Sequence, residues 1–135
     1  MLFLVLVTST KHYWVVSAER RRATLKEMSE AEHQALVDES LNYDQALRNS
    51  GHYISSNALQ FVETAATVRV KKGKVMVTDG PFAETREQVG GHILIEAKDM
   101  NEAIKLAAKI PPVRLGGVEI RPIKELTHSR DKSRE

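Results

Sequence analysis

Asp79 and His92 are the two residues of this sequence best placed for acid–base chemistry. Asp79 opens the run Asp79-Gly80-Pro81-Phe82, and a carboxylate at a strand end beside an apolar cleft can accept a proton from a bound molecule. His92 follows Gly90-Gly91, and its imidazole would complete an acid–base pair if it faced the same cleft. Two structural alternatives stay open: Asp79 as a turn residue, and His92 as a packed or solvent-edge histidine.

Four further residues are candidates for holding a ligand: Arg69, Phe82, Glu84 and Arg121. The two arginines stand in alternating strand patterns and could bind an anionic group, although cross-strand ion pairing explains them as well. The other two lie in the connection 78–91, called the strap below. Phe82 is expected to anchor the strap in the core.

The residue inventory excludes several kinds of site. The chain contains no cysteine, so it has no thiol nucleophile, disulfide or Cys-ligated zinc, and a cytoplasmic location is expected. Its histidines lack regular ligand spacing, so no metal is expected. The sequence also contains neither a glycine-rich phosphate loop nor a nucleophile elbow, and no cofactor is predicted.

Charge and length argue for one small domain that binds neither nucleic acid nor membrane. Lys and Arg number 20 against 18 Asp and Glu, and aromatic residues make up only 5% of the chain. A nucleic-acid interface typically has a one-sided basic surface with interleaved aromatic residues. The apolar run 2–7 is too short to span a bilayer. We expect a single domain over 1–125 and a charged tail over 126–135.

Local patterns predict the elements that must position these side chains. Residues 2–7 read as a buried first strand, and residues 8–28 as an irregular or partly helical excursion. Ser29-x-x-Glu32 has capping-box spacing and begins a helix that Gly51 ends. The remaining patterns predict strands at 52–59, 66–70, 74–78, 92–97 and 118–123, a short helical turn at 83–88, and a second helix that begins after Asp99.

This order of elements predicts a ferredoxin-like α+β fold: an antiparallel sheet with two helices on one face. The strands alternate apolar residues on both faces, so the face without helices also needs cover. A second copy of the chain is the simplest cover, which predicts a homodimer packed as a dimeric α+β barrel.

The strap carries a resemblance to a known family. Asp79-Gly80-Pro81-Phe82, then Glu84-Thr85, Glu87-Gln88 and Gly90-Gly91, are similar to the pattern of the DGPF family of YCII-related domain proteins. The resemblance extends through Ile110-Pro111 and the closing strand. It implies a dimeric α+β barrel in bacterial proteins of mostly unassigned activity, some of them encoded beside extracytoplasmic-function sigma factors.

The departures from that family concern function. Broader YCII-related proteins carry a histidine and an aspartate thought to act as a catalytic pair, and those positions correspond here to Ser40 and to Ile110-Pro111. Many DGPF proteins have glycine-glutamate where this chain has Ser56-Asn57, and an aromatic residue where it has His92. The family's catalytic pair therefore does not carry over.

Two hypotheses of different classes follow. The first is a small homodimer that holds a small organic ligand in its barrel cleft and performs cofactor-independent proton transfer, of the lyase or isomerase kind, with Asp79 as the base. The second is a non-catalytic regulatory or interaction module, for example one associated with an extracytoplasmic-function sigma factor. Whether Asp79 lies in a closed polar pocket or only caps local amides distinguishes the two.

Overall fold

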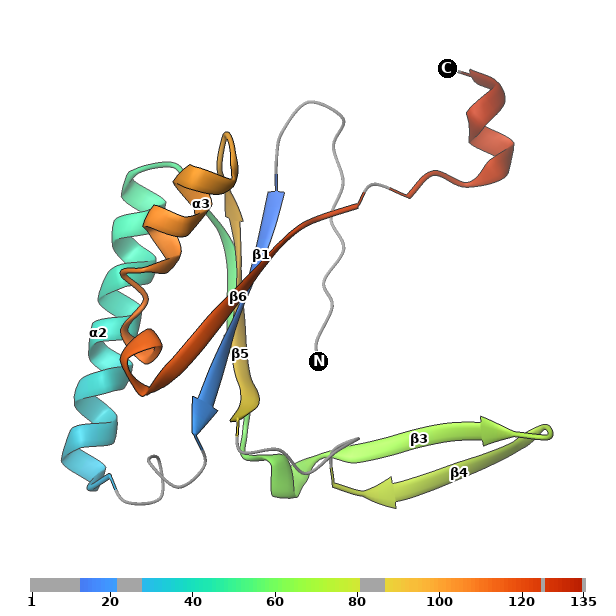
Figure 1. Ribbon diagram of the computed structural model, residues 1–135, viewed down its shortest axis with the longest axis horizontal. Coiled ribbons are helices and arrows are strands. Elements are labelled where there is room, and N and C mark those ends of the chain that lie inside the picture. Colours follow the sequence, from blue (N-terminus) through green and yellow to red (C-terminus); the bar gives the residue numbers. More distant parts are fainter. Residues whose placement is uncertain (1–12, 22–27, 81–86, 125, 135) are drawn as a thin grey trace.

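The chain folds as an α+β structure in which two helices cover one face of an antiparallel sheet (Figure 1). The computed structural model describes residues 13–21, 28–80, 87–124 and 126–134. The four-stranded sheet has the order β2-β5-β1-β6, and each neighbouring pair is antiparallel. Its strands are β1 (Tyr13–Arg21), β2 (Tyr53–Ala58), β5 (Glu87–Glu96) and β6 (Gly116–Pro122), and its helices are α2 (Glu30–Asn49) and α3 (Met100–Ala107).

Strands β3 (Ala66–Lys71) and β4 (Lys74–Asp79) form a separate hairpin, called the arm below. Lys72 and Gly73 have positive φ angles of 52° and 76°, as a tight hairpin turn requires, which confirms the predicted hairpin. Gly80 closes its base, because the Gly80 amide donates to the Ala65 carbonyl and Thr67 Oγ1 donates to the Gly80 carbonyl. Figure 1 shows the arm projecting away from the helices.

Both helix starts form at the residues that the sequence indicates. The Ser29 side chain accepts a hydrogen bond from the Glu32 amide, and the Asp99 side chain accepts one from the Glu102 amide. Helix α2 ends where Gly51, at φ 79°, turns the chain, and the His52 amide then donates to the Leu47 carbonyl. No helix in the described ranges has the length and apolar character needed to cross a bilayer.

The prediction for the beginning of the chain is wrong where the structure tests it. Tyr13–Arg21, expected within an irregular or partly helical stretch at 8–28, form β1, a central strand between β5 and β6. Tyr13 to Val16 are strong strand formers, and pairing on both sides decides the outcome. The predicted strand at 2–7 lies outside the described residues. Glu87 and Gln88, expected at the end of a helical turn, begin β5.

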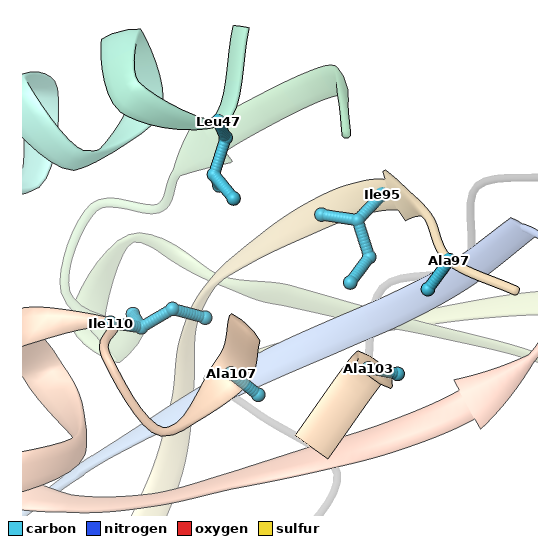
Figure 2. Close-up of a cluster of buried hydrophobic side chains, with 6 residues drawn as sticks. All are labelled: Leu47, Ile95, Ala97, Ala103, Ala107 and Ile110. Carbon is cyan, nitrogen blue, oxygen red and sulfur yellow. The ribbon is translucent and has the colours of Figure 1, made fainter. Parts of the chain in front are cut away.

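The hydrophobic core lies between the two helices and the sheet (Figure 2). Its buried members come from α2, from the end of β5, from α3 and from the segment after α3: Leu47, Ile95, Ala97, Ala103, Ala107 and Ile110. Two short 3-10 helices, Val62–Thr64 and Pro111–Leu115, connect regular elements, and a third, Ser129–Arg134, lies in the C-terminal tail. The alanines of α3 allow that helix to approach the sheet closely.

A bulge in β2 sets which of its side chains face the helices. Tyr53 lies opposite Ile95, but Ser55 already lies opposite Leu94 and Ser56 opposite Ile93, so one extra residue is inserted. In a regular strand Tyr53 and Ser56 would point to opposite faces. The bulge brings both to the helix side. Farther along, β2 and β5 approach so closely that a Cβ on Gly91 would lie 2.8 Å from the Asn57 carbonyl oxygen.

We predict that Gly91→Ala lowers the free energy of unfolding by roughly 1–3 kcal/mol, because the added methyl group would collide with backbone. Urea unfolding followed by circular dichroism measures the loss. Gly117→Ala is the matched control, since a Cβ there meets no atom within 4 Å; we expect it to change stability by less than about 0.5 kcal/mol. Equal effects of the two substitutions would contradict the close approach of β2 and β5.

Candidate functional site

The described residues line a cavity of about 600 Å³ between the first three-quarters of α2, the end of β2, the first part of β5 and the segment after α3. Its walls are mainly apolar and include Leu36, Val37, Leu41, Phe61, Ile93 and Ile110. Leu41 is 60% exposed and Phe61 47% exposed, so these two side chains mark an open mouth. Cavities of this size and character hold small organic molecules.

A short chain of hydrogen bonds ends at a carboxylate on the cavity wall. Ser56 Oγ donates to Asp44 Oδ2 at 2.8 Å, and Ser56 Oγ lies 2.8 Å from the Tyr53 hydroxyl. A serine has one hydroxyl hydrogen, and here Asp44 receives it, so Tyr53 must donate to Ser56. Asp44 is only 9% exposed and lines the cavity. The aligned donors stabilise its negative charge.

A second phenol, Tyr43, fixes the wall of the cavity rather than offering a reactive group. Its hydroxyl donates to the Leu106 carbonyl and so ties α2 to the end of α3. Burial raises the pKa of Tyr43 above its usual value. The described residues contain no cluster of three or more potential metal ligands. Besides Tyr43, the titratable residues on the cavity lining are the carboxylate Asp44 and two histidines, His33 and His92, within mainly apolar walls.

Of the four predicted ligand-binding residues, the structure describes Arg69 and Arg121, which lie in different sheets. Arg69 and Asp79 lie exposed on the arm, and Phe82 and Glu84 lie outside the described residues. Arg121 is exposed on β6, where its Nε lies 3.2 Å from Glu119 Oε1. This ion pair runs along one strand, whereas the sequence suggested cross-strand pairing as the alternative to ligand binding.

His92 lies on β5, in the other sheet from Asp79, and is 2% exposed. Neither ring nitrogen has a hydrogen-bond partner, so His92 forms no acid–base pair with Asp79. It contributes to the lining of the cavity, but Ile93 packs towards the helices, and strand alternation directs the His92 ring to the opposite sheet face from Asp44. Burial lowers the pKa of His92, which favours the neutral ring.

Most of the positions at which this chain departs from the DGPF pattern lie together around the cavity. Ser40, Ile110-Pro111 and Ser56-Asn57 all line the cavity. The sequence analysis identified these positions as departures but did not identify Asp44, the carboxylate that lies beside them on the cavity wall. A signal was present: Asp44 follows Ser40 by four residues and precedes Leu47 by three, so it falls on the core-facing stripe of α2.

We predict that His92→Phe stabilises the protein by roughly 1–3 kcal/mol, because phenylalanine keeps the ring shape and removes two unpaired buried nitrogens. Protonation favours the unfolded state, where the histidine pKa has its ordinary value near 6.5. Wild-type stability should therefore fall as pH drops below about 6.5, and the variant should lose this part of the pH dependence.

Chemical denaturation at pH 7.5 and 5.5 measures both effects. His128→Phe is the control, because His128 is an exposed histidine in the tail. If the His92→Phe variant shows the same pH dependence as wild type, the buried neutral histidine is contradicted.

Comparison with known proteins supplies the family. The chain matches the YCII-related domain over residues 1–127. It is also similar to an uncharacterized protein of Rhizobium meliloti (strain 1021), with 41% identity over 61 residues. That alignment covers 44% of this chain and 49% of the relative, so it spans about half the length of the curated protein that it matches. The extent of the domain match shows that the chain belongs to the YCII-related domain family.

Proposed function

We propose that this protein binds a small organic molecule in the cavity beside α2, and that a donor group of this ligand meets Asp44. The observation that carries the proposal is a carboxylate, 9% exposed, on the wall of a cavity of about 600 Å³ with mainly apolar walls. The walls would bury the body of the ligand, and the carboxylate would orient it. Proton transfer by Asp79 or His92 stays a prediction that these contacts do not support.

The proposal predicts that cavity ligands raise the melting temperature of the wild type in a thermal-shift screen of small aromatic and aliphatic compounds. For hits that carry a hydrogen-bond donor, Asp44→Asn should weaken binding about tenfold or more, because hydrogen bonds to charged groups contribute about 1.5–3 kcal/mol. Asp38→Asn makes the same charge change on the exposed side of α2 and should leave affinity unchanged. A screen without hits, or equal losses in both variants, would contradict the proposal.

We further propose that the fold has the ferredoxin-like arrangement and that two copies of the chain pair as a homodimer in which the arm takes part. The order β2-β5-β1-β6, the antiparallel pairing and the position of both helices on one face support this arrangement. The arm supports the pairing, because it projects to the helix-free side (Figure 1). Its four valines, on one face by register, are 57–68% exposed: Val68, Val70, Val75 and Val77.

An isolated two-stranded hairpin is marginally stable in water, so the arm needs a surface to pack on. Six residues of strand span about 20 Å, enough to reach past a second sheet packed about 10 Å away. The arm tip is basic, with Lys71, Lys72 and Lys74, and α2 exposes the acidic residues Glu30 and Glu32. A second copy therefore supplies both apolar cover and charge complementarity for the arm.

We expect the wild type to sediment as a dimer at micromolar concentration. The double variant Val70→Thr/Val75→Thr should raise the dimer dissociation constant at least about tenfold, or 1.4 kcal/mol, because it removes a cross-strand apolar pair from the proposed interface. Met76→Thr, on the other face of the arm, is the matched control and should have a smaller effect. A wild type that is monomeric at high micromolar concentration would contradict the pairing.

A further inference from the structure

The cavity has an imbalance of charge. Among the described residues that line it, Asp44 is the sole carboxylate, and none is lysine or arginine. Its Oδ2 accepts the Ser56 hydroxyl, whereas no described residue donates to Oδ1. Asp44 Oδ1 is not among the described side-chain atoms that are buried without a partner, so a ligand in the cavity can reach it. A positively charged donor forms a stronger hydrogen bond with a carboxylate than a neutral donor does.

The cation closest in sequence does not fill this role. Arg48 follows Asp44 by four residues, the spacing at which helical residues of opposite charge pair. Its guanidinium instead lies over the Tyr53 ring, 4.2 Å from the ring centroid. Tyr53 in turn donates to Ser56 and Ser56 to Asp44, so among the described residues the donors near this carboxylate are neutral hydroxyl groups rather than lysine or arginine side chains.

We infer that the ligand of this cavity is an organic cation: a protonated amine on a compact aromatic or branched aliphatic body. The ammonium group would donate to Asp44, while Leu36, Val37 and Ile93 would bury the apolar part. Phe61 at the mouth adds an aromatic face of the kind that favours cations. An anionic ligand would meet the Asp44 charge without any lysine or arginine on the lining to offset it. This inference rests on the proposed function and assigns its ligand class.

The test uses three probes with a common phenyl body: 2-phenylethylamine, 2-phenylethanol and 3-phenylpropionate. Isothermal titration and amide chemical shifts on the full chain at pH 7 would give affinity and location. The amine should bind at least about tenfold more tightly than the alcohol, with shifts at Asp44, Ser56 and Ile93, and the acid should bind most weakly. The amine preference should disappear in Asp44→Asn and persist in Asp38→Asn.

Ser56→Ala keeps the charge while it removes one donor, so its amine preference should survive even if Asp44→Asn proves unstable. If the alcohol binds as tightly as the amine at the same residues, the cavity binds ligands but the cationic class is wrong. If none of the three probes shifts the amide resonances of cavity residues and the wider screen also has no hits, both the proposed function and the cationic ligand class are contradicted. Amine binding that persists in Asp44→Asn would assign the ammonium to another place and overturn the inference.

Discussion

The pairing of β2 with β5 is the constraint on which the candidate site depends. One inserted residue after Tyr53 moves Ser56 to the position opposite Ile93, and so places Tyr53 and Ser56 on the same side of the sheet. Only then can the Tyr53 phenol and the Ser56 hydroxyl form one chain of hydrogen bonds that ends at the Asp44 carboxylate of α2, which accepts. Gly91 permits this close approach of the two strands, because it has no Cβ to collide with the Asn57 carbonyl oxygen.

Local chemistry in the sequence predicted much of this fold. Serine and aspartate caps, a glycine after α2 and a Lys-Gly turn each act through neighbouring residues, so their effects can be read without the tertiary structure. The assignment failed at Tyr13–Arg21, where the charged end of the strand hid its central place in the sheet. Pairing on both sides compensates for that composition, and pairing partners distant in sequence are not visible in a local pattern.

The site was harder to predict because its chemistry comes from burial. Asp79 stood out through its turn motif, yet the structure leaves it exposed on the arm, whereas Asp44 has an unremarkable sequence context and becomes buried only when α2 packs on β2. The resemblance to a family came closer to the cavity than the search for acid–base residues did. The positions at which this chain departs from that family line the cavity, as do Gly90 and Gly91 from the end of the family motif, whereas Asp79 at the start of the motif lies exposed on the arm.

The position of Arg48 has a consequence for how tightly the cavity can hold any guest. A rotation about its side-chain bonds, away from the Tyr53 ring, would carry the guanidinium towards the carboxylate one helical turn earlier. The chain thus contains its own competitor for Asp44. The free energy of the Arg48–Tyr53 stacking sets the fraction of time for which Asp44 is available to a ligand. If this stacking were weaker, Arg48 would occupy the Asp44 site for more of the time.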